Sequence, residues 1–371
     1  MQVLYEVLND RYQTYGRVVH LYSYHNKVSA VDLNERLQPF ANIGSGTVSP
    51  KWLNVDHSGS KRATYVKEAP YRISFRADEE DQIAQVSSYV CQKLVGATAK
   101  YAGDITMRDK TRKFGFLFND SPDRKNALRA GIKARCGLDI TDESPDWDKP
   151  TGPLTLQRAN VTTVIMVIGN TGQITAPNNA TGIGYFPEWF IPSNAGSLGA
   201  DINFNGRTAN SAQWGNAFGV TFDYRRDALA NQPWYRAYRE GCADCPEPRV
   251  GMQGVTFASA NYDAFTMLFY GIQAAGPRLT VENLDKGLHA IPARPSDDPF
   301  RPAAYFAPGN YSFIKDAMAI WWDPSGQPPG GANPGCYRLP RQGLRARAGE
   351  WPAGDGDVKQ PGSPCQGDTF T

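Results

Sequence analysis

Polar side chains follow two apolar runs near the start of this sequence and could bind the charged end of a small molecule. Ser45, Thr47 and Ser49 come just after the run FANI. Their hydroxyl groups, with the backbone N–H groups beside them, could hold a carboxylate or a phosphate, or they could form a polar loop without a ligand. Arg76 follows the run YRISF and could reach an anionic ligand, although a surface ion pair with an acid two or three residues further on is an equal alternative.

Polar residues also end two longer apolar runs further along the chain. Asn119 and Asp120 follow FGFLF, and Asn170 and Thr171 follow VTTVIMVIG. In open α/β sheets ligands bind outside the carboxyl ends of the strands, so these residues are candidates for ligand contacts. Each pair could instead lie at the start of the next helix, where short polar side chains cap backbone N–H groups.

An acid and two aromatic residues surround Pro187. An exposed Glu188 beside Tyr185 and Trp189 would attract an ammonium group through its charge and through cation–π interaction. Packing of Trp189 in a hydrophobic core is the alternative. The same run ends at Asn194, which we include among the candidate ligand-binding residues.

Motifs of the common enzyme classes do not occur in the sequence. The segment GSGTVSP does not match the G-x-S-x-G pattern of serine hydrolases, and its GSG lacks the third glycine of a dinucleotide-binding loop. There is no G-K-[ST] phosphate loop and no H-E-x-x-H metal motif. The sequence therefore predicts a protein without catalytic residues, metal or cofactor. A hydrolase that uses a serine of GSGTVSP stays open as an alternative.

The cysteines are even in number, so all of them could pair in an oxidising compartment, but the sequence does not choose among the pairings. Cys242 and Cys245 form the one close pair. Gly241 and Pro246 place this pair in a loop, which favours a structural disulfide over a redox dithiol or half of a zinc site. The six positions are Cys91, Cys136, Cys242, Cys245, Cys336 and Cys365.

The overall composition is that of an ordinary globular protein. Apolar residues make up 41% and charged residues 20% of the 371 residues, and the formal net charge is +2. So small a charge argues against a dedicated nucleic-acid-binding protein. No apolar stretch approaches the roughly 18–20 residues that cross a bilayer. The chain is long enough for two lobes that each have a core.

The order of apolar runs predicts an α/β fold. Runs that end in small or polar residues are typical of buried parallel strands, and apolar residues three or four positions apart predict helices between them. We expect strands at 17–25, 40–43, 71–75, 112–120, 161–170, 185–194 and 217–225, and a strand pair or hairpin at 312–324. We expect helices at the start of the chain and around 78–94, 128–136, 262–276 and 279–291.

The composition changes beyond about residue 326, where Gly, Pro and Arg dominate. This change predicts a poorly structured tail with turns. We interpret its basic cluster as solvated rather than as a docking site; the cluster comprises Arg338, Arg341, Arg345 and Arg347.

Taken in order, these segments resemble type I periplasmic substrate-binding proteins, in the branched-chain amino acid-binding class of ABC importers. The resembling stretches cover most of residues 17–325. They are APYRISFRADEEDQIAQVSSYVCQKL, RKFGFLFND with a following helix that ends in CGLDI, VTTVIMVI, GYFPEWF, ANYDAFTMLFYGIQAAG and GNYSFIKDAMAIWWDP. No stretch is diagnostic by itself, so the ordered set carries the resemblance.

The resemblance implies two Rossmann-like lobes joined by three hinge crossovers, with a ligand bound between them. Lobe one would comprise residues 1–109 and 255–325, lobe two would comprise 110–254, and 326–371 would be a C-terminal extension. The candidate residues named above would contact the ligand from both lobes. A disulfide between the two cysteines of the extension would cover part of the molecule.

By the same resemblance, the protein would capture an amino acid or a related carboxylate or amide in an extracytoplasmic compartment, the periplasm or the cell surface. It would deliver this ligand to an ABC transporter permease. It would be a monomer without a nucleic-acid partner, peripheral to the membrane and lipid-anchored through a segment before Met1.

Two departures from the family pattern keep other functions open. By the resemblance, we expect lobe one to lack the family's opening strand before Met1, and we expect residues 50–66 to be abbreviated or diverged where the family has a full βαβ step. The alternatives are a ligand-sensing domain of the same fold and a structural relative that has lost its ligand.

Overall fold

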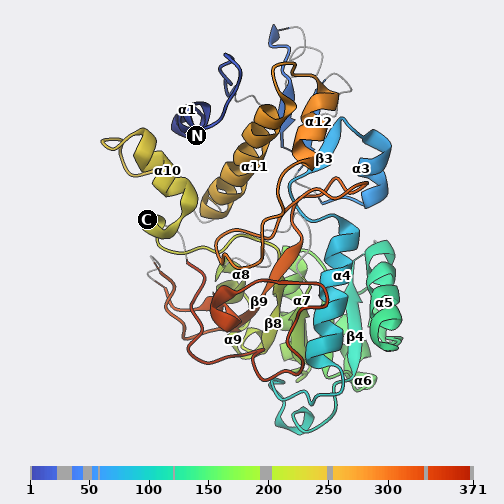
Figure 1. Cartoon of the computed structure of the whole chain (residues 1–371). Helices are drawn as coiled ribbons and strands as arrows, with labels where there is room; N and C mark the ends of the chain where they lie inside the picture. The colour runs from blue at the N-terminus through green and yellow to red at the C-terminus, as the bar shows by residue number, and fades with distance from the viewer. Residues whose placement is uncertain are drawn as a thin grey trace.

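The computed structural model describes residues 2–22, 36–44, 52–56, 59–119, 122–192, 203–248, 254–329 and 333–367. Along these ranges the chain forms a small β-sheet and a large one, each with its own helices (Figure 1). The expected α/β class is confirmed.

The small sheet has the strand order β1-β2-β3, and both of its strand pairs are parallel. Its strands are β1 (Ala41–Ile43), β2 (Leu53–Asp56) and β3 (Arg72–Ser74). Strand β2 and helix α3 (Arg62–Glu68) occupy the segment expected to be abbreviated, so a β-strand and a helix are both present there.

The large sheet has the order β10-β9-β8-β7-β6-β4-β5, with β11 also paired to β9. Its parallel strands are β4 (Phe114–Phe118), β5 (Glu143–Ser144), β6 (Thr163–Val167), β7 (Glu188–Ile191) and β8 (Ala217–Thr221). Every residue of β4, β6, β7 and β8 is buried. These strands are continuous apolar runs because helices cover both faces of the sheet.

Alternate residues of each buried strand enter two different cores. Phe116 and Ile165 pack in the core that includes Val86 of α4 (Glu79–Tyr89) and Ile132 of α5 (Pro122–Cys136). Their neighbours on the other face, such as Met166, pack with residues of α6 (Thr151–Arg158), α7 (Asn170–Gly182) and α9 (Ser211–Trp214). This two-residue period follows from the pleat of a strand.

The remaining helices complete the two halves. Helices α1 (Gln2–Arg11), α10 (Pro233–Gly241), α11 (Gly254–Ala275) and α12 (Val281–His289) lie at the end of the molecule that holds the small sheet (Figure 1). Helix α8 (Asn203–Thr208) lies beside the large sheet. A π-helical turn continues α4 (Val90–Leu94), and three 3₁₀ turns span Ile105–Met107, Leu229–Asn231 and Pro340–Gly343.

The described chain passes between the two halves three times, as expected. We call these passes the crossover segments: residues 75–78 between β3 and α4, 222–232 between β8 and α10, and 290–315 between α12 and β9 (Asp316–Asp323). Helix α4 and strand β9 were both expected in lobe one. In the structure α4 packs against α5 beside the large sheet, and β9 is a strand of the large sheet. The exact division into lobes remains a prediction.

Two expectations about secondary structure were wrong. Residues 17–22 have no strand pairing, and the rest of that predicted strand lies outside the described residues. The expected hairpin at 312–324 is the single strand β9, which pairs antiparallel with β8. Its other partners come from the C-terminal segment: β10 (Cys336–Arg338) and β11 (Ala346–Arg347), both antiparallel to β9.

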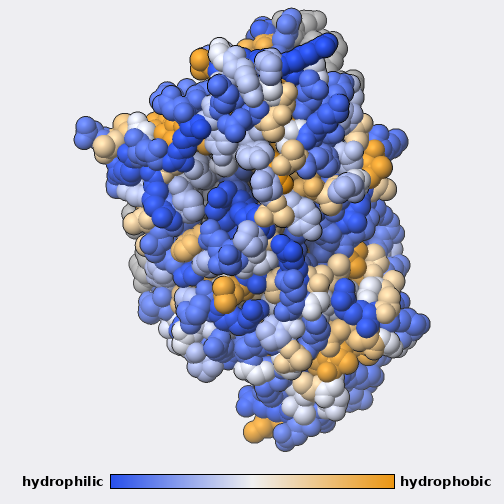
Figure 2. Space-filling view, viewed as in Figure 1, coloured by the Kyte–Doolittle hydropathy of each residue, from blue (hydrophilic) through white to orange (hydrophobic). Residues whose placement is uncertain are grey.

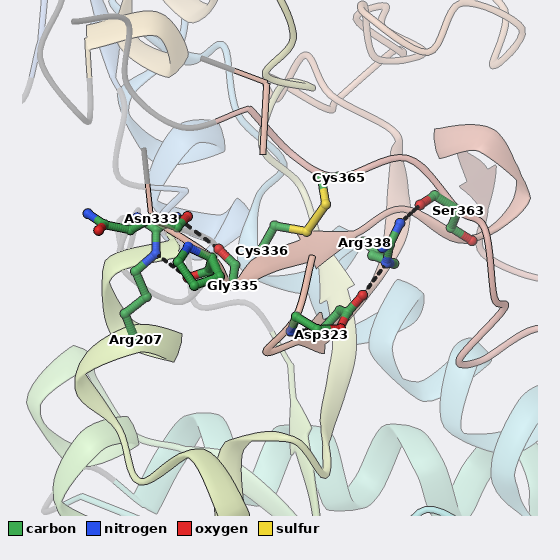
Figure 3. Close-up of a disulfide and its surroundings, with 10 residues drawn as sticks. Arg207, Asp323, Asn333, Gly335, Cys336, Arg338, Ser363 and Cys365 are labelled. Carbon is green, nitrogen blue, oxygen red and sulfur yellow. Dashed lines mark hydrogen bonds and ion pairs between the residues drawn. A yellow bond between two sulfur atoms is a disulfide. The ribbon is translucent and has the colours of Figure 1, made fainter. Parts of the chain in front are cut away.

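The C-terminal segment is therefore ordered, which corrects the expected tail. Arg338 donates to the Asp323 carboxylate at 2.5 Å and to the Ser363 carbonyl oxygen at 2.5 Å, while Arg207 of α8 donates to three backbone carbonyls at 333–335 (Figure 3). Arg345 is buried with Asp316 at 2.6 Å. The interpretation of these arginines as a solvated cluster was wrong at Arg338 and Arg345, because both hold carboxylates of β9.

All six cysteines pair. Cys242–Cys245 closes a loop after α10, and Cys336–Cys365 joins β10 to the end of the C-terminal segment (Figure 3). Both pairs confirm the expectations. The third disulfide, Cys91–Cys136, ties the π-helical turn after α4 to the end of α5.

Candidate ligand-binding site

The carboxyl ends of four parallel strands meet at one edge of the large sheet. Because β4, β6, β7 and β8 are neighbours and run in the same direction, the residues that follow them share this edge. The crossover segment 222–232 leaves the sheet from the end of β8. The edge therefore lies where the chain passes to the small sheet, which is the position at which open α/β sheets bind ligands.

Three of the predicted ligand residues lie together on this edge. The backbone N–H of Asn119 donates to the carbonyl oxygen of Val167 at 3.4 Å, which joins the end of β4 to the end of β6. Asn170 and Thr171 form the first turn of α7, directly after β6. The side chains of Asn119, Asn170 and Thr171 are exposed. Two amides and a hydroxyl at one sheet edge can donate and accept hydrogen bonds to a polar ligand.

Arg76 lies in the first crossover segment, but its side chain is buried. Its Nη1 donates to Asp223 of the second crossover segment at 2.8 Å, and its backbone carbonyl accepts from Phe313 of the third. The alternative of a surface ion pair with Asp78 or Glu79 was therefore wrong. The guanidinium joins two crossovers, so Arg76 holds the hinge, and in this conformation it is not exposed to a ligand.

Glu188 was expected to be an exposed acid, and this expectation was wrong. It is fully buried and accepts two hydrogen bonds from Arg112, at 2.7 and 3.0 Å. The Thr163 hydroxyl and the Tyr101 backbone N–H add bonds of 2.7 and 3.1 Å. With both carboxylate oxygens satisfied by protein groups, Glu188 stabilises the large sheet and does not attract an ammonium ligand.

The two aromatic residues near Glu188 belong to the core. Tyr185 is fully buried and donates to the Val161 carbonyl oxygen at 2.8 Å. Trp189 is also fully buried, and its indole N–H donates to Gln213 at 3.0 Å. The core alternative for Trp189 is confirmed, and the expected ammonium site at these residues is not formed.

Five predicted ligand residues lie outside the described residues: Ser45, Thr47, Ser49, Asp120 and Asn194. They fall in 45–51, 120–121 and 193–202. Their participation in a site remains a prediction.

A charged network that sequence reasoning missed surrounds the first and third crossover segments. Asp81, in the first turn of α4, accepts from Lys315 at 2.8 Å, from the Ser312 hydroxyl at 3.0 Å and from Arg62 at 2.6 Å. Burial acts to raise the pKa of the Asp81 carboxyl, but Lys315 and Arg62 outweigh it and hold that pKa below its ordinary value. The partners lie far apart in sequence, so no local pattern reveals them.

A second network surrounds Asp263 of α11. This buried carboxylate accepts from Arg294 at 2.7 and 2.6 Å, from Arg301 at 2.8 Å and from the Tyr224 hydroxyl at 2.6 Å. Burial acts to raise the pKa of Asp263, but the two arginines hold it well below its ordinary value. Tyr224 belongs to the second crossover segment and both arginines to the third, so this carboxylate fixes two crossovers to α11.

The two halves also touch beside the candidate site. Lys61, just before α3, forms an ion pair of 3.3 Å with Asp123 in the first turn of α5. Both side chains are more than half exposed. Such a pair contributes little to stability and can break when the halves separate.

Within the described ranges, no group of three or more His, Cys, Asp or Glu side chains could hold a metal ion. None of the helices in those ranges is long and apolar enough to span a membrane.

No protein-family model matches the chain, and no curated protein matches its sequence. Solved structures do share its fold. A fatty acid ABC transporter substrate-binding protein from Thermomonospora curvata is 15% identical, with a TM-score of 0.57, over 100% of this chain and 90% of that one. An ABC transporter substrate-binding protein from Aeropyrum pernix is 12% identical, with a TM-score of 0.57, over 96% and 92%. The branched-chain amino acid transporter substrate-binding protein LivJ from Streptococcus pneumoniae, in complex with isoleucine, is 14% identical, with a TM-score of 0.56, over 86% and 88%.

Proposed function

We propose that this chain, which has the fold of type I periplasmic substrate-binding proteins, captures a small polar solute between two hinged lobes. The observation that carries the proposal is the set of three crossover segments beside the carboxyl edge of the large sheet. Three crossovers restrict the lobes to opening and closing about one hinge, and closure surrounds a ligand at that edge.

The ligand is an amino acid or a related carboxylate or amide. The exposed amide and hydroxyl groups of Asn119, Asn170 and Thr171 support this class. These side chains are uncharged and can both donate and accept hydrogen bonds to polar groups of a ligand. The position of α7 also supports it: its amino-terminal turn lies at the same edge, where backbone N–H groups favour a carboxylate.

The protein acts outside the cytoplasm and delivers the captured solute to the permease of an ABC transporter. Three disulfides support an oxidising compartment, because such bonds persist outside the cytosol. The face shown in Figure 2 is mainly hydrophilic, and its apolar residues lie in small separate patches. Such a surface fits a protein that binds its permease transiently.

A thermal-shift screen with amino acids, amides and short carboxylates tests this function. A ligand at 100 times its dissociation constant stabilises the folded state by about 2.7 kcal/mol, so we expect at least one compound to raise the melting temperature.

Asn119→Ala and Thr171→Ala should each raise the dissociation constant of that ligand by about tenfold, because each removes one hydrogen bond. Asn126→Ala is the matched control, since Asn126 is an exposed asparagine on α5. A screen without any stabilising compound would show that the fold is retained without solute capture.

A further inference from the structure

Part of the C-terminal segment lies against the start of the second crossover segment. The backbone N–H of Arg226 donates to the side-chain Oε1 of Gln366 at 2.7 Å, and the Arg226 carbonyl oxygen accepts from the Gly367 N–H at 2.7 Å. The Arg225 guanidinium donates to the carbonyl oxygen of Gln342 at 3.2 Å. These bonds fix the crossover to residues that were expected to be a poorly structured tail.

Arg345 adds a charged contact to the same crossover. Its buried guanidinium donates to the carbonyl oxygens of Phe222 and Asp223 at 3.3 and 2.9 Å. It also donates to the carboxylate of Asp316 at 2.6 Å, at the residue where the third crossover ends and β9 begins. The Asp223 carboxylate in turn accepts from Arg76 of the first crossover. The C-terminal segment is therefore joined to the second crossover directly, to the end of the third through Asp316, and to the first through Asp223.

The residues that make these contacts are fixed to the large sheet. Gln366 directly follows Cys365, whose disulfide with Cys336 joins it to β10 (Figure 3). The backbone N–H of Gln366 donates to the carbonyl oxygen of Tyr337, also on β10, at 2.6 Å. The Gln366 side chain is therefore held in place by its own strand partner when it accepts from the crossover.

The same stretch of the crossover is also held from the other half of the molecule. The Tyr224 hydroxyl donates to Asp263 of α11, which lies with the small sheet. Residue 224 is thus bound to one half, while residues 222, 223, 225 and 226 are bound to the C-terminal segment on the other. A hinge motion that changes the backbone torsions of 222–226 has to break bonds on one of the two sides.

We propose that the C-terminal segment is a brace on the hinge, which acts through Gln342, Arg345, Gln366 and Gly367. We call these four residues the hinge brace. They hold the second crossover in its present conformation, and closure of the lobes works against them. The inference rests on the proposed function, because it assigns a role in the opening and closing of the same two lobes.

The hinge brace favours the conformation in which the candidate site is uncovered. The side chains of Asn119, Asn170 and Thr171 are exposed in this conformation, and closure around a solute would cover them. Bonds that are made only in the uncovered conformation shift the equilibrium between the two conformations toward it. A protein with a weakened brace therefore changes conformation at the hinge more often.

Hydrogen exchange of the full chain without solute tests the hinge brace. The Phe313 amide of the third crossover donates to the Arg76 carbonyl oxygen of the first, so its exchange reports on separation of the crossovers. Gln366→Ala removes the oxygen that accepts from Arg226. We expect the Phe313 amide to exchange about fivefold faster in this variant, the effect of one net hydrogen bond. The rate is measured relative to the Phe116 amide of β4, which reports on global unfolding.

Gln360→Ala is the matched control. The Gln360 side chain accepts from the Arg341 N–H at 2.7 Å, an equivalent bond that stays within the C-terminal segment. This variant should leave the relative exchange rate of Phe313 unchanged. Gly367→Val replaces Gln366→Ala if that variant does not fold, since a Cβ at Gly367 would lie 3.2 Å from the Arg226 carbonyl oxygen and push the segment away.

Equal acceleration in the two glutamine variants would overturn the hinge brace in favour of general loosening of the C-terminal segment. An unchanged relative rate in Gln366→Ala would overturn it as well. Because the exchange is measured without solute, its result is independent of the thermal-shift screen. Acceleration confined to Gln366→Ala supports the brace even where no compound of the screen stabilises the protein.

Discussion

The buried ion pair between Arg76 and Asp223 joins two crossover segments. Both side chains are about nine-tenths buried, and the Nη1 to Oδ1 distance is 2.8 Å. Removal of one partner leaves a buried charge without compensation, so we expect Arg76→Leu to lower the free energy of unfolding by about 3–5 kcal/mol. Urea unfolding measures this change. The double variant with Asp223→Leu should recover most of the loss, and a loss in Arg76→Leu of under about 1 kcal/mol would contradict the buried pair.

Asp81 gives the hinge a dependence on pH. Its pKa in the folded protein lies below its ordinary value of 3.8, so its stabilising effect is present above that value and is lost as pH falls through the folded pKa. We expect acidification below about pH 4 to destabilise the wild type more steeply than Asp81→Asn. Urea midpoints of both proteins at neutral and acid pH test this, and parallel pH profiles would show that Asp81 does not contribute.

The sequence indicates where a residue lies when that depends on its own strand, and it fails when the surroundings of the residue depend on a distant partner. Asn119 and Asn170 were placed at strand ends because each follows an apolar run, and their role as ligand contacts remains a prediction. Glu188 was misread because its partner Arg112 lies 76 positions away. A local sequence pattern does not show that the Arg112 guanidinium binds the Glu188 carboxylate in the core.

The disulfide Cys336–Cys365 joins β10 to the end of the C-terminal segment. It closes a loop of 29 residues around β10 and β11. Loops of this length gain about 2–4 kcal/mol from a disulfide, because the bond restricts the unfolded chain. We expect Cys336→Ser with Cys365→Ser to lower the unfolding free energy by that amount.

Denaturant unfolding under non-reducing conditions measures the loss. The matched control is Cys242→Ser with Cys245→Ser, whose loop spans only 3 residues and should contribute much less. Equal losses in the two double variants would show that loop closure does not explain the effect.

The sequence predicted the central strands of the large sheet but not its C-terminal strands. Strands β4, β6, β7 and β8 are continuous apolar runs, and each was expected from its own residues. The C-terminal strands were missed because their buried residues, such as Tyr337 and Ala346, are isolated among Gly, Pro and Arg. Their stability comes from pairing with β9, which local periodicity does not reveal.

At the scale of the whole molecule, two sheets and three crossovers make a hinge. Arg76, Asp81 and Asp263 each connect at least one crossover to another part of the chain. The order of the segments carried the family resemblance, and that resemblance implied the two-lobed fold. The lobe boundaries were harder to predict, because the sequence of a helix does not show which sheet the helix packs against. Helix α4 illustrates this, since it follows the first crossover and packs on α5.

Closure of the lobes around a solute is the central claim, and a distance across the hinge tests it directly. Spin labels at Val66→Cys on α3 and Ala130→Cys on α5 would sit on exposed helical positions of the two halves, and every native cysteine is already paired. Pulsed electron paramagnetic resonance should give a broad distance distribution without ligand. With a pool of amino acids, amides and short carboxylates, the account predicts a narrower distribution at a different mean distance. An identical distribution with and without the pool would contradict it.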